Sequence, residues 1–176
     1  MAESGLNVVI LGPTTVMGRE IVPVLRERGL AVRNLRLLGV EEEVGDRVEG
    51  EDEELSVELL EPKALADADV VFVPPNVEVP EEIRKAAQQA GALVVDASGL
   101  AAGDVPLIFP GINDEELEEL ESARGATIAL PGAAAAQLAA VLLPLEAKAG
   151  LAGVQVVSLE AVSSFGVPGM EELSMQ

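Results

Sequence analysis

A short glycine-containing segment, Gly12-Pro13-Thr14-Thr15-Val16-Met17-Gly18, carries the clearest chemical signal in this sequence. It follows an apolar, β-branched run over Asn7–Leu11 and precedes a stretch, Arg19–Arg28, that continues with helical spacing of apolar residues. A helix that begins after a glycine turn directs free backbone N–H groups toward an anion such as a pyrophosphate. The candidate cofactor-binding residues are therefore Gly12, Thr14, Thr15, Val16, Met17 and Gly18.

This loop departs from a complete dinucleotide-binding pattern at two positions. The middle glycine, which lets a phosphate approach the backbone, falls at Thr15, and Pro13 has no N–H to donate. A tight turn between a strand and a helix, without any ligand, accounts for the two outer glycines as well. Cofactor binding and a purely structural turn both stay open for this loop.

Composition narrows the remaining chemistry. The chain has no Cys and no His, which excludes a thiolate nucleophile, an imidazole base and a Cys/His metal site. Its net charge of −20 argues against nucleic acid and anionic membranes as partners, because both require a positive face. The acidic run over residues 41–54 indicates a solvated loop or hairpin, in preference to a metal site. Asp96 and Glu160 could act as acids or bases, but a structural role is the simpler interpretation for a single carboxylate.

Apolar segments that alternate with helical patterns must position these residues. The alternation predicts an α/β fold with a Rossmann-like, doubly wound parallel sheet. Because ligands bind beyond the carboxyl ends of such strands, Gly12–Met17, Pro74–Val77 and Asp96–Gly99 are expected to line one rim. The expected elements are buried strands over Asn7–Leu11, Leu35–Leu38, Ala68–Val73 and Leu93–Asp96, an edge strand over Leu55–Leu59, and a helix over Glu81–Ala90 between Pro80 and Gly91.

Beyond Asp96 the pattern changes, and it mixes short elements with one long helix. The expected elements are a short strand over Asp104–Pro110, an acidic helix over Asn113–Ala123 capped by Asn113, a helix over Ala133–Ala149 kinked or stopped at Pro144, a long strand over Val154–Val162, and the start of a helix over Gly166–Gln176. The 176 residues suit one large domain, or one domain and a fragment. Without a secretory signal or an apolar run of membrane-spanning length, a cytoplasmic location is expected.

Three motifs in register give this sequence a family resemblance: Asp96-Ala97-Ser98-Gly99-Leu100, the segment Asp104–Asn113 and the segment Leu130–Leu145. Together they resemble the aspartate-β-semialdehyde dehydrogenase family, and are closer still to its Usg-type non-catalytic homologues. The resemblance covers nearly all of this chain but only about the N-terminal half of a family member. It implies a nucleotide-binding domain over residues 1–130, followed by the beginning of an α+β substrate and dimerisation domain over 131–176. The reaction it implies is the NADP-dependent reductive dephosphorylation of aspartyl phosphate, a step of amino-acid biosynthesis.

The same resemblance places the family's catalytic groups on residues that lack their chemistry. The nucleophilic cysteine of a motif similar to Asn-Pro-Asn-Cys falls at Ala133, and the glutamine that orients the intermediate falls at Glu160. The arginine that holds the substrate phosphate has no counterpart among Leu100–Gly103. Because loss of a nucleophile alone typically costs on the order of a millionfold in turnover, little catalysis is expected.

The implied cofactor site is altered as well. The family's Ser and Arg that bind the 2′-phosphate of NADP align near Val40 and Glu42, and a carboxylate there would repel a phosphate. Pro74-Pro75-Asn76 replaces a segment of small residues and is expected to narrow the adenosine end. NAD or NADP binding therefore remains open but weakened.

Three functions are consistent with these observations. The first is a catalytically inactive homologue, a pseudoenzyme, that acts by binding a ligand or partner. The second is an active NAD(P)-dependent dehydrogenase of the family's type that uses carboxylates such as Asp96 or Glu160. The third is a structural subunit that completes a sheet with a second copy or another chain, because an unpaired strand over Val154–Val162 is a liability in solution.

Overall fold

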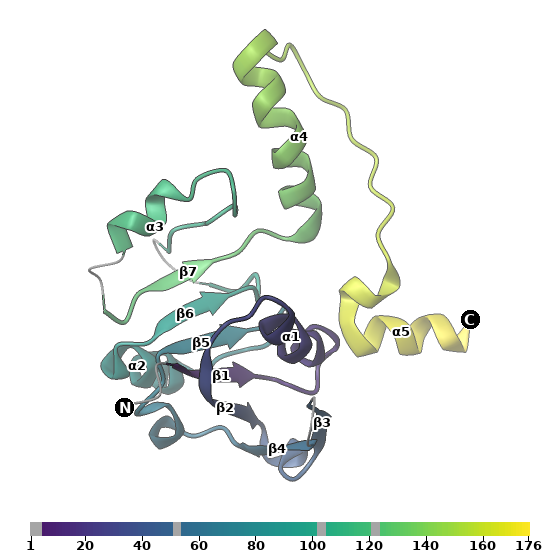
Figure 1. Cartoon of the computed structure of the whole chain (residues 1–176). Helices are drawn as coiled ribbons and strands as arrows, with labels where there is room; N and C mark the ends of the chain where they lie inside the picture. Colours follow the sequence, from purple (N-terminus) through teal and green to yellow (C-terminus); the bar gives the residue numbers. More distant parts are fainter. Residues whose placement is uncertain (1–4, 51–53, 102–104, 121–123) are drawn as a thin grey trace.

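The computed structural model describes residues 5–50, 54–101, 105–120 and 124–176. Within these residues, seven strands form one sheet in the order β3-β4-β2-β1-β5-β6-β7, and all neighbours except β3 and β4 are parallel (Figure 1). The chain order reverses between β1 and β5, as in a doubly wound dinucleotide-binding sheet, so the predicted fold class is confirmed. The strands are β1 (Leu6–Leu11), β2 (Val32–Gly39), β3 (Arg47–Glu49), β4 (Glu54–Leu59), β5 (Val70–Val73), β6 (Leu93–Asp96) and β7 (Thr127–Ala129).

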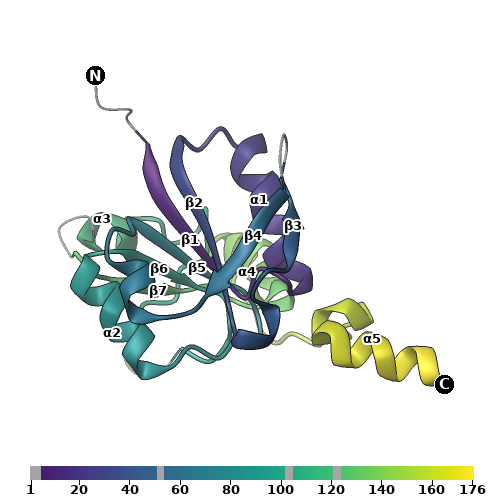
Figure 2. The ribbon, with the colours of Figure 1, turned by 90° about the horizontal axis from the view of Figure 1, so that it is seen from below.

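Two helices, α1 (Val16–Glu27) and α2 (Glu81–Ala90), cover opposite faces of this sheet (Figure 2). Successive side chains of a strand point to opposite faces, and β1 shows the consequence. Ile10 belongs to the core cluster that contains Val22 of α1, whereas Leu11 belongs to the cluster that contains Ile83 of α2. A strand buried on both faces needs an uninterrupted apolar run, which is the pattern that predicted β1.

The acidic stretch after β2 forms a one-turn helix, η1 (Glu41–Glu43), and then a hairpin of β3 and β4. The predicted hairpin is therefore present, although residues 51–53 lie outside the described ranges. The strand predicted over Leu55–Leu59 is confirmed as part of β4, but its predicted edge position is wrong, because β4 pairs with β2 on one side and with β3 on the other. Val48 is buried between exposed Arg47 and Glu49 and belongs to the core cluster that contains Val57 of β4, so β3 adds one apolar side chain to the core at the edge of the sheet.

The predicted strand over Asp104–Pro110 is also wrong. Residues 102–104 lie outside the described part, and the remainder makes one parallel bridge, between Leu107 and Ala129. Pro106 and Pro110 have no N–H to contribute, so a longer ladder is not available here.

The acidic helix begins two residues later than predicted. It is α3 (Glu115–Leu120), and residues 121–123 of the predicted range lie outside the described part. Asn113 does not act as a simple cap. Its Oδ1 accepts the Phe109 N–H at 2.6 Å and its Nδ2 donates to the Leu107 carbonyl at 3.0 Å, so the side chain mainly closes the preceding turn.

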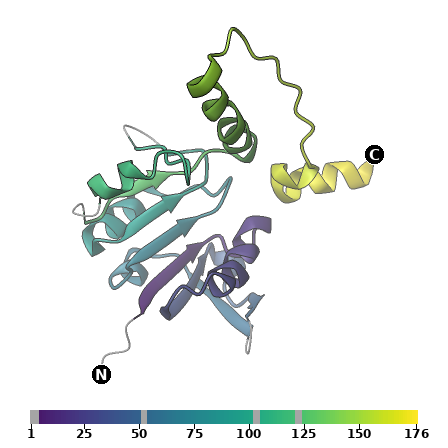
Figure 3. The ribbon, with the colours of Figure 1, turned by 45° about the horizontal axis from the view of Figure 1, so that its top comes forward.

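Residues 133–176 extend away from the sheet (Figure 3). Helix α4 (Ala133–Ala149) has the predicted bounds and continues through Pro144, so of the two alternatives at that proline, a kink or a stop, the stop is wrong. Helix α5 (Gly166–Met175) confirms the predicted C-terminal helix. The predicted strand over Val154–Val162 is wrong: residues 153–161 are irregular, and η3 (Val162–Phe165) follows them. A strand requires a partner for its N–H and C=O groups, and no strand in the described chain pairs with this segment. In the described ranges, no helix is long and apolar enough to cross a membrane.

Candidate functional site

The three loops predicted to line one rim do meet at the carboxyl end of the sheet, beside the reversal between β1 and β5. The Gly12 N–H donates to the Leu38 carbonyl at 3.0 Å, which fixes the glycine loop to the end of β2. A side chain on Gly12 would lie 2.7 Å from Val77, so the loop after β5 packs directly on this glycine. The Asn76 N–H donates to the Ser98 carbonyl at 3.3 Å and joins that loop to the one after β6.

Both outer glycines of the first loop are required by its geometry. Gly12 has a φ of +55°, in the left-handed region that favours glycine. At Gly18, a Cβ would overlap the carbonyl oxygen of Gly12 and lie 2.8 Å from the Thr15 hydroxyl. The absence of a side chain at Gly18 therefore lets the first turn of α1 pack against the end of β1, which is the function expected of this glycine.

Thr15, at the position of the missing middle glycine, is the N-cap of α1. Its hydroxyl accepts the Gly18 N–H at 3.0 Å and donates to the Gly12 carbonyl at 2.8 Å. The N–H groups of Val16 and Met17, the first two of the helix, have no hydrogen-bond acceptor in the described chain. Thr15 thus uses one donor of the helix N-terminus, and two remain for an anion.

The acidic side chain that reaches this loop is Glu43, which the sequence reasoning missed. The exposed Val40 and Glu42 were the residues aligned with the cofactor's 2′-phosphate. In the structure, Glu43 is half-buried, its Oε1 accepts the Thr14 hydroxyl, and its Oε2 accepts the Val40 N–H at 2.9 Å. A Glu three residues after a helix cap is a known signal, but a cap residue such as Ser or Thr normally accompanies it, and Val40 does not provide one.

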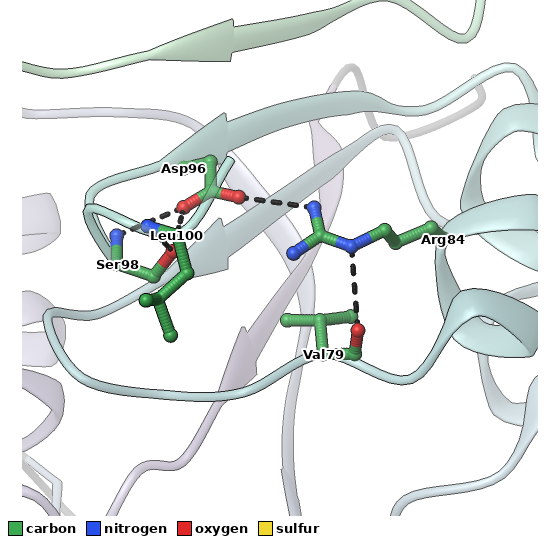
Figure 4. Close-up of polar contacts among 5 residues, drawn as sticks. All are labelled: Val79, Arg84, Asp96, Ser98 and Leu100. Atoms are coloured by element: carbon green, nitrogen blue, oxygen red, sulfur yellow. Dashed lines mark hydrogen bonds and ion pairs between the residues drawn. The ribbon is translucent and has the colours of Figure 1, made fainter. Parts of the chain in front are cut away.

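Asp96, at the end of β6, is the most deeply buried carboxylate at this rim, with 1% of its surface exposed. Its Oδ1 accepts the Ser98 N–H at 2.8 Å and the Ser98 hydroxyl at 2.5 Å, and its Oδ2 accepts Arg84 Nη1 at 3.2 Å (Figure 4). Arg84 also donates from Nε to the Val79 carbonyl at 3.3 Å, and so joins α2 to the loop that precedes it. These contacts hold the rim loops in place and engage both carboxylate oxygens of Asp96.

The position aligned with the nucleophile, Ala133, is the first residue of α4 and is exposed. The Leu130 N–H donates to the Asp96 carbonyl at 2.8 Å, so the segment that leads into α4 is anchored beside the rim. A cavity of about 220 Å³ lies between these segments. Its lining residues are Asp96, Gly99, Ala101, Val105, Leu107, Ala129 and Leu130.

Glu160, aligned with the orienting glutamine, lies apart from this region. It is exposed on the irregular segment after α4, and its Oε1 accepts the Ser158 hydroxyl at 3.2 Å. No hydrogen bond or ion pair joins Glu160 to Ala133 or to the rim within the described chain. Likewise, no group of three carboxylates in the described ranges could hold a metal ion.

Comparison with known proteins places this geometry in a family. The family model described as "Semialdehyde dehydrogenase, NAD binding domain" matches residues 7–120. The aspartate-semialdehyde dehydrogenase of Prochlorococcus marinus is 32% identical over 96% of this chain and 48% of its own length. A USG-1 protein homolog of Azotobacter vinelandii is 30% identical over 97% of this chain and 51% of its own length.

A solved structure agrees with these relatives. The crystal structure of aspartate semialdehyde dehydrogenase II complexed with ASA, from Vibrio cholerae, has a TM-score of 0.82 and 27% identity over 98% of this chain and 52% of that chain. The chain thus spans about half the length of the relatives it matches. With its sheet order, its glycine loop and these similarities, the chain belongs to the semialdehyde dehydrogenase family, and residues 7–120 correspond to the NAD binding domain of that family.

Proposed function

We propose that this chain is a non-catalytic member of its family, a pseudoenzyme, which acts by binding a dinucleotide at the Gly12–Gly18 loop. The observation that carries the proposal is Ala133 at the start of α4, in a chain with no Cys and no His. A methyl group cannot attack an acyl carbon or form a thioester, so the family's acyl transfer has no nucleophile at this position.

The binding part of the proposal rests on what the loop retains. It lies at the reversal of strand order, where doubly wound sheets bind their ligands. Because Gly12 and Gly18 have no side chains, the loop and the first turn of α1 pack closely together. The N–H groups of Val16 and Met17 are available to donate hydrogen bonds to phosphate oxygens. A helix N-terminus also carries a partial positive charge, which offsets the acidic character of the chain locally.

The alternative is an active dehydrogenase that uses a carboxylate in place of the cysteine. The contacts of the two candidates favour the non-catalytic proposal. Asp96 is buried and its oxygens are engaged by Arg84 and Ser98, and Glu160 is exposed on a segment apart from the rim.

Turnover tests this directly. The purified protein is mixed with aspartate semialdehyde, phosphate and NADP⁺ or NAD⁺, and formation of the reduced cofactor is followed by its absorbance. The aspartate-semialdehyde dehydrogenase of Prochlorococcus marinus provides the positive control. We expect no rate above the blank without protein; a rate that scales with protein concentration would overturn the non-catalytic proposal.

Ligand binding is tested separately by differential scanning fluorimetry with an added dye, because the chain has no Trp or Tyr. A ligand that binds only the folded state raises the melting temperature, and the stabilisation grows with the logarithm of the ligand concentration above its Kd. We expect NAD⁺ at millimolar concentration to raise it. No shift with NAD⁺, NADP⁺ or AMP would exclude a nucleotide site.

A second candidate function is assembly with another protein chain, and the surface of residues 133–176 favours it. None of the described residues of α4, η3 or α5 is buried, and Val157 and Leu159 are 86% and 96% exposed. Apolar side chains that are exposed over such a length commonly mark an interface. We propose that residues 131–176 begin a second, dimerisation domain, and that this surface packs on a second copy of the chain or on a separate chain.

Light scattering across a concentration series tests the assembly. We expect a dimer of the wild-type chain, and its loss in a Leu159→Asp variant. Val44→Asp, at a valine that is 48% exposed in the loop before β3, is the control and should leave the dimer intact. A wild-type monomer at high concentration excludes the homodimer.

A further inference from the structure

We propose that Glu43 makes the glycine-loop site selective for a dinucleotide whose adenosine ribose has free hydroxyls, and that it rejects a 2′-phosphate. The site would thus take NAD⁺ or NADH in preference to NADP⁺ or NADPH. This inference rests on the proposed function, since it presupposes that the Gly12–Gly18 loop binds a dinucleotide.

The first step concerns where the Glu43 carboxylate lies. Strands β1 and β2 are parallel neighbours, with Leu11 paired to Leu38, so the glycine loop and the end of β2 are adjacent. The turn of η1 brings Glu43 back over this junction, where it bonds both the Thr14 hydroxyl of the glycine loop and the Val40 N–H. In doubly wound folds, an acidic side chain beyond the second strand binds the ribose hydroxyls of NAD.

The second step concerns how firmly the carboxylate is held. A Cβ on Gly39 would overlap Glu43 Oε2 and lie 2.9 Å from Val57 Cγ1. Glycine at the last position of β2 therefore provides the space that the carboxylate occupies. The main-chain N–H of Val40 and the hydroxyl of Thr14 each donate a hydrogen bond to the Glu43 carboxylate. Together they orient this carboxylate between the glycine loop and the end of β2.

The third step concerns the capacity of the carboxylate for a ligand. An ionised carboxylate has about four lone-pair positions, and the Thr14 hydroxyl and the Val40 N–H occupy two. The remaining positions can accept two hydrogen bonds, which is the number that the 2′- and 3′-hydroxyls of one ribose donate. Hydrogen bonds to an ionised acceptor are the stronger kind.

The fourth step concerns charge. Glu41 and Glu42 are exposed on the same turn, where solvent screens their charges, whereas Glu43 is half-buried, so the carboxylate that a phosphate on the 2′-oxygen would meet most directly is that of Glu43. The arginine that follows this turn, Arg47, forms an ion pair with Glu54 at 2.5 Å. Sites that accept NADP provide an arginine for the 2′-phosphate, and this turn presents acidic side chains instead.

Equilibrium binding tests the selectivity in the full chain. NADH and NADPH, which differ only in the 2′-phosphate, are titrated and followed by their own fluorescence, and AMP and 2′-deoxy-AMP are titrated by calorimetry. We expect NADH to bind at least about tenfold more tightly than NADPH, and AMP more tightly than 2′-deoxy-AMP by a similar factor. In Glu43→Gln, both preferences should fall toward unity.

Glu42→Gln is the matched control, because it removes the same charge from the same turn at an exposed residue that does not contact the glycine loop. A solvent-screened charge at this position should change the NADH-to-NADPH ratio by less than about threefold. The melting temperature of each variant verifies that it is folded. If the wild type binds none of the four ligands, the proposed dinucleotide function fails. If it binds NADH and NADPH equally, or if Glu43→Gln leaves the ratio unchanged, the selectivity of Glu43 is refuted while dinucleotide binding stands.

Discussion

Replacing Gly18 with alanine is expected to destabilise the fold, although alanine is the better helix former. In an exposed helix the change would stabilise by up to about 1 kcal/mol. Here the new Cβ would overlap the Gly12 carbonyl oxygen and lie 3.0 Å from Pro13 Cα, and neither backbone atom can rotate away. Such overpacking costs about 1–3 kcal/mol. Displacing the Thr15 hydroxyl, 2.8 Å from the same Cβ, would also weaken the helix cap by about 1 kcal/mol.

The net expectation is a loss of about 2 kcal/mol, which in a domain of this size lowers the melting temperature by about 4–8 °C. Urea and thermal unfolding are followed by far-ultraviolet circular dichroism, since the chain has no Trp or Tyr. Gly153→Ala is the control, because a Cβ at Gly153 meets no atom within 4 Å. Its stability should change by less than about 0.5 kcal/mol. A Gly18→Ala variant as stable as the wild type would refute the claim that this glycine is required for close packing.

Three further predictions concern the polar contacts of the fold. Thr15→Ala should lower the free energy of unfolding by about 1 kcal/mol through loss of the N-cap, while Thr15→Ser should retain most of it, as urea titration would show. Asp96→Ala should cost about 2–4 kcal/mol because it leaves Arg84 without its carboxylate, and adding Arg84→Met should recover part of that loss in a double-mutant cycle. The hydrogen bond from Arg36 lowers the pKa of Glu58, so this pair stabilises the fold at neutral pH, and its contribution disappears as the pH falls through that lowered pKa. Glu58→Gln should therefore lose no more than about 1 kcal/mol at pH 7, since the pair is partly exposed, and the difference from the wild type should vanish in acid.

Local sequence patterns were sufficient to predict the strands and helices that contribute most of the buried apolar residues. The bounds predicted for α2 and β6 match the structure, because an apolar pattern ended by Pro80 on one side and Gly91 on the other leaves little freedom. The convergence of the three rim loops was also predictable, since the carboxyl ends of parallel strands meet at one edge.

The contacts that distinguish one acidic residue from its neighbours were not predictable in this way. Glu41, Glu42 and Glu43 are identical in type and adjacent, and no local pattern indicates which of them faces the glycine loop. The turn after β2 determines that Glu43 faces the glycine loop, because its carboxylate fits the space beside Gly39 and accepts the N–H of Val40. The irregular segment over residues 153–161 was not predictable for the same reason. Its alternating apolar residues are typical of a strand, but a strand forms only if another strand, distant in sequence, pairs with it.

By itself, the sequence determined which reactive groups residues 1–176 can have. A chain without Cys or His has neither a thiolate nor an imidazole wherever it folds, because composition is independent of conformation. Only the tertiary structure decided where the remaining polar groups lie. It buried Asp96 against Arg84 and Ser98, and it placed the Glu43 carboxylate on Thr14, because those contacts join residues that only the packing of separate strands brings together.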